Sequence, residues 1–405
     1  MLKELFYKKS YLNISTSIIS RGFQKILNFI SFLYIVNNVS PEILGNFQFV
    51  LSILMTVSIF SLNGMNISLI AALSKKRNGF FLKATKLSFS YSFIGSIILI
   101  IFSLYNFING ENAMAICFII ASLLNPFFKG LLSWKVKKIS FGKYIELSKI
   151  ELLNSIILNL FLILSVIFYT NDQIYLVLIS VLIPSLQNII LFLKETKFKT
   201  KNSINKFRKE TKYGFQYSIQ EIFPILAKEI DKIIIYFFLT PVSLGFYYVL
   251  CRLPEFIKNF MQEIIFFIMP KFAKQKFYSN KLKKMTNFFN LISFLLIVLF
   301  AFTLYPLIYK SIFNFEYHEY LLMSQVLLCS LGFTTDVLIK GGFISTQLKI
   351  ESFKRYTIFN SMIKIILSPI LIYFFSIWGA IYSIVIQRVL TKIYVNYLLK
   401  MYHGK

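Results

Sequence analysis

The feature that most constrains the fold of this chain is a series of apolar segments, each about 20 residues long, which recurs from one end to the other. Of the 405 residues, 57% are hydrophobic and only 15% are charged, whereas a soluble domain carries about 25% charged residues. Backbone groups inside a bilayer must form their hydrogen bonds within one segment, so the segments are expected to be helices. The sequence therefore predicts an all-α, multi-pass membrane protein.

Charged or turn-forming breaks divide the apolar segments into twelve predicted spans. They cover residues 13–36, 44–72, 87–108, 113–132, 150–169, 174–193, 213–239, 243–269, 287–309, 321–345, 356–376 and 378–399. The longest basic stretch, 194–212, lies midway along them. We expect it to be a cytoplasmic linker between an N-terminal six-helix lobe (1–200) and a C-terminal six-helix lobe (213–405).

The distribution of basic residues predicts the orientation in the membrane. The chain contains 44 Lys and Arg against 17 Asp and Glu, and almost all the loop lysines and arginines lie in every second loop. In the intervening loops the only basic residue is Lys310. Since positively charged loops remain in the cytoplasm, both termini are predicted to be cytoplasmic. An anionic inner leaflet explains these loops better than nucleic acid does, because no aromatic-rich soluble module accompanies them.

Cysteines and the N-terminal segment give no sign of other chemistry. Cys117, Cys251 and Cys329 lie in apolar segments without metal-ligand spacing. The N-terminal segment has no small-residue cleavage site and leads into a helix with a polar stripe. It is therefore predicted to be a first span rather than a secretory signal.

An internal repeat relates the two predicted lobes. The segment 40–50 reads SPEILGNFQFV and the segment 240–250 reads TPVSLGFYYVL. Both copies join the first span of a lobe to its second, where proline and glycine suit a tight turn. Each lobe has an even number of spans, so the repeats are expected to be parallel and to leave a cavity between two bundles.

The segment 213–239 combines a charge cluster with a membrane span. On a helical projection Glu221, Lys228 and Lys232 fall within about 40° of one another, with Glu229 and Asp231 beside them. Asp231 lies about 13 Å from the predicted outer end of the span, near its middle. We predict that this face lines a polar interior, with a local Lys228–Asp231 pair. The opposite face, predicted to contact lipid, consists of Ile222, Phe223, Leu226, Ala227, Ile230, Ile233, Ile234, Phe237 and Phe238.

Three further spans carry polar stripes. These are Ser17, Arg21, Gln24, Lys25, Asn28 and Ser31 in the first span, Arg252, Glu255, Asn259 and Glu263 with Gln262 in the eighth, and Gln325, Cys329, Asp336 and Lys340 in the tenth. Within the tenth span Asp336 and Lys340 are an i,i+4 pair. Ionisable groups at membrane depth normally face a bundle interior and mark functional sites. Salt bridges between helices or snorkelling are the structural alternative, which stays open for Lys25, Lys228, Lys340 and Lys364. A planar guanidinium can bind phosphate through two hydrogen bonds, which favours a functional role for Arg21 and Arg252.

Several segments together resemble a known family of transporters. They read SRGFQKILNFISFLYIVNNVSPEILGNFQFVLSI in the first two spans and KEIDKIIIYFFLTPVSLGFYYVLCRLPEFIKNFMQEIIFFIMPKFAK in the second half, and the layout from LYPLIY to GAIYSIVIQRVLTKIYVNYLL is similar. The chain resembles the polysaccharide repeat-unit flippases of the multidrug/oligosaccharidyl-lipid/polysaccharide (MOP) exporter superfamily. The resemblance implies a MATE-like fold, with two six-helix lobes around a cationic central cavity.

The resemblance also implies a function and site residues. Such proteins carry an undecaprenyl-diphosphate-linked oligosaccharide from the cytoplasmic to the outer leaflet of the bacterial inner membrane, by alternating access, for O-antigen or capsule synthesis. The basic residues that would hold the diphosphate are Arg21, Lys25, Lys228 and Arg252. The acids that would couple transport to H⁺ or Na⁺, with no other cofactor, are Glu221, Asp231, Glu255 and Asp336. Twelve spans rather than fourteen disfavour the peptidoglycan-precursor branch. A polysaccharide polymerase and a chain-length regulator are the protein partners to expect.

Two alternatives remain open. A membrane polymerase or ligase would need a large outer loop or a catalytic cluster, whereas the only histidines here are His318 and His403, and no catalytic or metal-binding motif is evident. We therefore expect no enzyme activity. A cation-coupled multidrug exporter of the same superfamily would share the architecture, but it should favour an acidic or apolar cavity.

Overall fold

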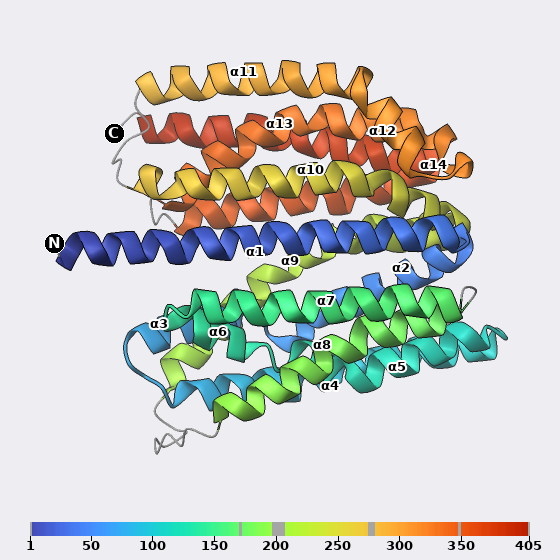
Figure 1. The fold of residues 1–405 in the computed structure, drawn as a ribbon, viewed down its shortest axis with the longest axis horizontal. Coiled ribbons are helices and arrows are strands. Elements are labelled where there is room, and N and C mark those ends of the chain that lie inside the picture. The colour runs from blue at the N-terminus through green and yellow to red at the C-terminus, as the bar shows by residue number, and fades with distance from the viewer. Residues whose placement is uncertain (1, 170–171, 197–206, 274–279, 347–349, 404–405) are drawn as a thin grey trace. The chain divides into compact units, whose positions relative to one another are not determined.

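The described part of the chain is helical throughout. A computed structural model describes residues 2–169, 172–196, 207–273, 280–346 and 350–403, and within these ranges the chain forms helices and no strand (Figure 1). The all-α prediction is therefore confirmed. The central part of the predicted basic linker, 197–206, lies outside the described residues.

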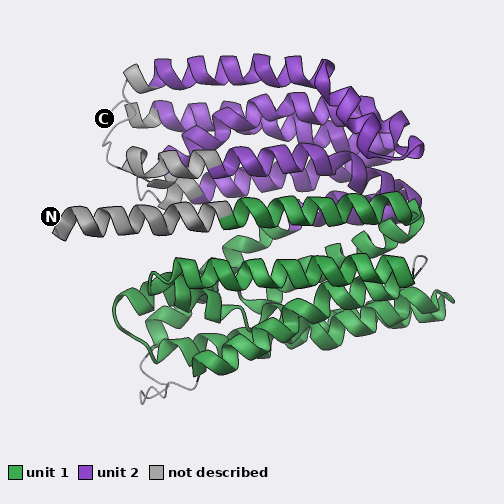
Figure 2. Ribbon diagram, in the orientation of Figure 1, with its two compact units in different colours: residues 1–225 green, residues 226–405 purple. Residues whose placement is uncertain are grey.

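The chain divides into two compact units, residues 1–225 and residues 226–405 (Figure 2). Unit 1 contains α1 (Leu2–Asn38), α2 (Pro41–Val57), η1 (Ser58–Ser61), α3 (Gly64–Ser74), α4 (Phe80–Ile108), α5 (Asn112–Lys129), α6 (Ser133–Ser140), α7 (Tyr144–Phe168), α8 (Gln173–Thr196) and the first part of α9 (Arg208–Phe238). Unit 2 contains the rest of α9, α10 (Pro241–Ala273), α11 (Asn280–Phe302), α12 (Leu304–Ile312), η3 (Phe315–Tyr320), α13 (Leu321–Thr346) and α14 (Ile350–His403). The boundary between the units lies within α9, so the lobes predicted from the 194–212 segment stay a prediction.

Eight helical segments in the described ranges are long and apolar enough to cross a membrane. Each of the twelve predicted spans falls on a described helix or on a pair of helices. The span predicted at 44–72 is interrupted after η1, where Leu62 adopts a left-handed conformation (φ 50°). Helix α14 contains the last two predicted spans and is broken at Ser376 (φ 52°, ψ −133°). Helices α9 and α10 are not among the eight, and both carry the charged residues that the sequence places at membrane depth.

The two copies of the internal repeat begin their helices in the same way. The Ser40 hydroxyl accepts a hydrogen bond from the backbone N–H of Ile43 (3.5 Å), and the Thr240 hydroxyl accepts one from that of Ser243 (3.1 Å). In each copy a proline follows the capping residue, at a position where a helix needs no N–H donor. The leucine four residues after each cap is fully buried. The shared motif is therefore a helix start anchored in the core of its own unit.

In unit 1, small residues bring helices into close contact. A side chain at Gly64 of α3 would approach backbone atoms of α9, at 2.3 Å from Ser218 N and 2.5 Å from Gly214 O. The backbone N–H of Gly64 donates to the Ser218 hydroxyl at 3.1 Å. This approach of α3 to α9 therefore requires glycine, as is common where helices pack inside membranes.

We predict that Gly64→Ala destabilises the protein. The added methyl group meets backbone rather than a movable side chain, so the free energy of unfolding should fall by about 1–3 kcal/mol. Thermal unfolding of the purified protein in detergent measures this loss. Gly22→Ala in α1 is the matched control, because a side chain there meets no atom within 4 Å. Equal melting temperatures for the two variants would contradict the α3–α9 contact.

Candidate functional site

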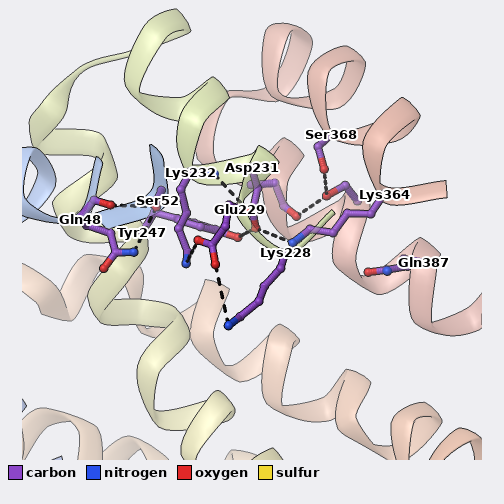
Figure 3. A network of polar contacts seen from close by, with 12 residues as sticks. Gln48, Ser52, Lys228, Glu229, Asp231, Lys232, Tyr247, Lys364, Ser368 and Gln387 are labelled. Atoms are coloured by element: carbon purple, nitrogen blue, oxygen red, sulfur yellow. Dashed lines mark hydrogen bonds and ion pairs between the residues drawn. The ribbon is translucent and has the colours of Figure 1, made fainter. Parts of the chain in front are cut away.

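A buried aspartate joins three helices of unit 2 (Figure 3). Asp231 of α9 is 2% exposed. Its carboxylate forms an ion pair with Lys364 of α14 (2.9 Å) and accepts a hydrogen bond from the hydroxyl of Tyr247 on α10. Tyr247 is also buried. A carboxylate in an apolar bundle is stable only when it is paired and hydrogen-bonded, so this contact fixes α9, α10 and α14 relative to one another.

The neighbouring charges of α9 form a second, local group. Glu229 is buried and forms an ion pair with Lys232 at 2.8 Å. Lys228 forms a longer ion pair with it, at 3.8 Å, and the Lys228 side chain is 76% exposed. The predicted pair between Lys228 and Asp231 is therefore wrong. The cation that neutralises Asp231 belongs to α14, which is far away in the sequence. A helical projection of α9 alone cannot include it.

The predicted apolar face of α9 is partly confirmed. Phe237 and Phe238 are more than half exposed, as expected for a surface open to lipid. Ala227 and Ile234 are buried, so their assignment to that surface is wrong. Part of the apolar side of α9 is therefore buried by packing, in addition to the side that carries the charges.

Further cationic side chains of unit 2 lie near this site. Lys258 of α10 is repelled by the charges of Arg388, Lys364 and Lys228 and attracted by that of Glu255. Arg388 of α14 donates a hydrogen bond to the Leu327 carbonyl (2.8 Å) and another to the Ser330 hydroxyl, both on α13. Neither bond neutralises its charge. This part of unit 2 therefore has more positive than negative charge.

Residues of the α10 stripe differ in their surroundings. Arg252 is half-buried, with its guanidinium carbon 5.7 Å from the ring centre of Tyr248. A cation–π contact of this kind helps to position the guanidinium group. Glu255 is exposed and forms no ion pair with the residues that the structure describes.

Asp336, another of the predicted acids, has its own group of partners in unit 2, different from those of Asp231. Asp336 of α13 is buried and forms an ion pair with Lys340 one turn later, at 2.6 Å. The side-chain amide of Asn290 on α11 donates a second bond to it. The predicted i,i+4 pair is therefore confirmed, and for Lys340 the structural interpretation holds. Lys364 is a salt-bridge residue as well.

The predicted residues of unit 1 are Arg21, Lys25 and Glu221, and each is half-buried. Their relation to the charges of unit 2 stays a prediction. Further along the predicted stripe of α1, Asn28 accepts hydrogen bonds from Asn159 (2.7 Å) and Ser155 (3.0 Å) of α7. That part of the stripe therefore binds a neighbouring helix. The side chain of Ser17 lies outside the described residues.

Sequence reasoning did not single out Tyr247 and Lys258. Lys258 follows Glu255 by three residues on the same helix, so its position in the α10 stripe was available as a signal. Tyr247 is one of 24 tyrosines and carries no distinguishing pattern. Only its contact with Asp231 reveals it.

The sequence also matches a known protein family. The model of the family described as "Polysaccharide biosynthesis protein" matches residues 11–276, which is more than half of the chain. The chain belongs to this family. The polysaccharide-biosynthesis family that the resemblance indicated is thereby confirmed.

Solved structures show the same fold. The lipid II flippase MurJ in an inward closed conformation is similar with a TM-score of 0.74 and 15% identity, over 96% of this chain and 87% of that chain. An inward-facing multidrug resistance MATE family transporter of the MOP superfamily is similar with a TM-score of 0.62 and 12% identity, over 95% and 97%. No curated protein sequence matches significantly. At these identities the likeness shows a transporter fold and not a substrate.

No metal centre is found in the described part of the chain. No group of three or more His, Cys, Asp or Glu side chains there could hold a metal ion. The acids of the site are instead surrounded by lysines, tyrosine and asparagine, which suits charge pairing rather than metal coordination.

We predict that Asp231→Asn destabilises unit 2, because it leaves the buried ammonium group of Lys364 without its partner. Breaking a buried ion pair by removing one charge costs about 3–5 kcal/mol. The double variant Asp231→Asn/Lys364→Met removes both charges and should recover much of the loss. Thermal unfolding in detergent measures both.

The matched control for this test is Lys228→Gln, which changes an exposed lysine three residues before Asp231 on the same helix. It should leave the melting temperature within about 1 °C, since exposed ion pairs contribute little. A double variant no more stable than Asp231→Asn would show that the pair does not govern the stability of this site.

Proposed function

We propose that the protein is a flippase that moves an undecaprenyl-diphosphate-linked oligosaccharide repeat unit from the cytoplasmic to the outer leaflet of the bacterial inner membrane. It would do so by alternating access, as a step in the synthesis of a surface polysaccharide such as O-antigen or capsule. The observation that carries the proposal is the surplus of cationic side chains inside unit 2 of a chain from the polysaccharide biosynthesis family.

The chemistry of the substrate supports this assignment. A diphosphate-linked sugar has a multiply charged anionic group that needs cations not already neutralised within the protein. Lys364 and Lys232 are paired with acids, whereas Arg388 and Lys258 are not in ion pairs with the described residues. We therefore extend the proposed diphosphate set beyond Arg21, Lys25, Lys228 and Arg252. Lys258 and Arg388 join it.

Transport is proposed to be coupled to H⁺ or Na⁺. Of the four candidate acids, Asp231 and Asp336 already hold lysine partners. A carboxylate bound to an ammonium group has little affinity left for a second cation. Glu255 and Glu221 form no ion pair within the described ranges, so we favour them for the coupling role, and Glu255 lies next to the cationic site.

The proposed setting follows from the same function. Both termini and the basic loops would be cytoplasmic, where membrane lipids are anionic. A polysaccharide polymerase and a chain-length regulator would act on the translocated unit at the outer face.

The alternative is a cation-coupled multidrug exporter, which the likeness to MATE transporters favours. Cationic drugs would be repelled by Lys258, Arg388 and Arg252. An anionic head group is therefore the better fit to unit 2.

We predict that Arg252→Gln and Lys258→Gln each slow flipping of a diphosphate-linked lipid oligosaccharide by at least about tenfold, since each removes a charge-assisted contact to phosphate. The measurement is accessibility of the labelled lipid to an external reagent in vesicles that contain the purified protein. Lys149→Gln, which changes an exposed lysine of unit 1, is the control and should flip normally. Transport of cationic dyes with no flipping would establish the exporter alternative.

Ion coupling gives a separate prediction. Glu255→Gln should abolish the dependence of flipping on a pH or sodium gradient while leaving downhill exchange of the lipid, because only the titratable oxygen is lost. Asp231→Asn/Lys364→Met keeps Glu255 and should retain the gradient dependence. A normal gradient response of Glu255→Gln would move the coupling role to Glu221.

A further inference from the structure

Unit 2 contains a pocket that the proposed transport site does not use. It has a volume of about 580 Å³ and lies between α11, α13 and α14. Its polar lining consists of Lys283, Asn287, Asn290, Asp336, Lys340, Lys392, Asn396 and Lys400. The start of α11 and the end of α14 lie at the same end of unit 2 (Figure 1), the end that the positive-inside rule predicts to be cytoplasmic.

The charge of the pocket is strongly unbalanced. Asp336 is the only acid among the lining residues that the structure describes, and the buried ammonium group of Lys340 already neutralises it. The other three lysines, Lys283, Lys392 and Lys400, form no ion pair with any residue in the described ranges. Lys392 lies over the ring of Phe333 at 5.2 Å, which orients it without removing its charge. The pocket therefore presents three uncompensated positive charges.

Lys340 orients the side-chain amides of two neighbouring asparagines. Its ammonium group donates to the side-chain oxygens of Asn396 (2.7 Å) and Asn287 (3.4 Å). Lysine has only donors, so both asparagines must turn their oxygens toward it. Their amide N–H₂ groups are left free to donate to a ligand. The pocket thus combines three cations with two neutral donors, a set that suits the oxygens of a phosphate group.

One buried acceptor in the same pocket lacks a donor. The side-chain amide of Asn290 donates to Asp336, so its orientation is fixed, because the reverse would place two oxygens together. Its Oδ1 atom is buried and has no hydrogen-bond partner among the described residues. A buried acceptor without a donor is costly. A ligand that suits this pocket should therefore bring a hydroxyl group as well as a phosphate.

The surroundings of the pocket favour a lipid as the source of both groups. Leu291 lines the pocket and belongs to a row of exposed apolar side chains along α11. The row consists of Phe288, Leu291, Leu295, Leu299 and Phe302, each more than half exposed. Basic pockets between membrane helices at the cytoplasmic side commonly bind anionic lipid head groups. Acyl chains could follow this row away from the pocket.

We propose that this pocket binds the head group of an anionic phospholipid that carries a hydroxyl, as phosphatidylglycerol does. Lys283, Lys392 and Lys400 bind the phosphate together with the amides of Asn287 and Asn396, and Asn290 Oδ1 accepts a hydrogen bond from the hydroxyl. The site is separate from the cationic side chains around Asp231.

The test is lipid binding to the delipidated, full-length protein in detergent, measured by native mass spectrometry. Phosphatidylglycerol should bind at least about tenfold more tightly than phosphatidylethanolamine. Phosphatidylethanol has the same charge and no free hydroxyl, so it should bind several-fold more weakly than phosphatidylglycerol. The triple variant Lys283→Gln/Lys392→Gln/Lys400→Gln should lose the preference for phosphatidylglycerol.

The matched control is Lys75→Gln/Lys86→Gln/Lys149→Gln, which removes the same charge from exposed positions of unit 1 and should keep the preference. Equal loss in both triple variants, or none in the pocket variant, would overturn the site. Glycerol 3-phosphate and inorganic phosphate are titrated by calorimetry as the soluble arm. Binding of these with the same lysine dependence, and no binding of phosphatidylglycerol, would overturn the lipid source and leave a soluble phosphate ligand.

Asn290→Ala should reduce the discrimination between phosphatidylglycerol and phosphatidylethanol, and unchanged discrimination would overturn the role of its oxygen.

Discussion

A carboxylate buried among apolar helices must be neutralised where it lies, and unit 2 is organised around this requirement. Asp231 connects α9 to α10 and α14 through Tyr247 and Lys364. Asp336, with Lys340, connects α13 to α11 and α14 through asparagine side chains. Each acid therefore holds three helices together. In a bilayer, where apolar side chains gain little by leaving lipid, such polar contacts contribute much of the specificity of helix packing.

The same ion pairs determine which cationic side chains remain available to bind a ligand. Lysines that neutralise Asp231, Glu229 and Asp336 are occupied, so Lys258 and Arg388 supply much of the uncompensated positive charge at the proposed transport site. Unit 1 contains a buried ion-pair contact of its own, because Lys138 of α6 pairs with Glu146 of α7 (2.6 Å) and Glu195 of α8 (3.0 Å). Some other contacts in unit 1 are neutral. Helix α1 contacts α7, and α4 contacts α5, through amide and hydroxyl groups of uncharged residues. The two units share a capped helix start at Ser40 and Thr240 and yet differ in where they place charge.

The two cationic regions of unit 2 differ in the state of their acids. Around Asp231, an exposed glutamate lies among the cations, which suits a site where an ion and an anionic substrate compete. In the pocket of α11, α13 and α14 the one acid of the described lining is buried and paired, so the surrounding lysines form a fixed positive surface. A fixed surface suits a ligand that stays bound. The physical contrast supports one site for transport and another for a resident lipid.

The sequence by itself determined the all-helical, multi-pass architecture, because apolar length and backbone hydrogen bonding leave no other solution in a bilayer. It also determined local contacts such as Asp336–Lys340 and the capped repeat, since residues three or four apart on a helix are neighbours whatever the fold. Tertiary structure alone decided that Asp231 pairs with Lys364 and not with Lys228, and that Tyr247 takes part. These partners lie on different helices. Periodicity reports which face of a helix is polar, whereas packing decides which residue of another helix meets that face.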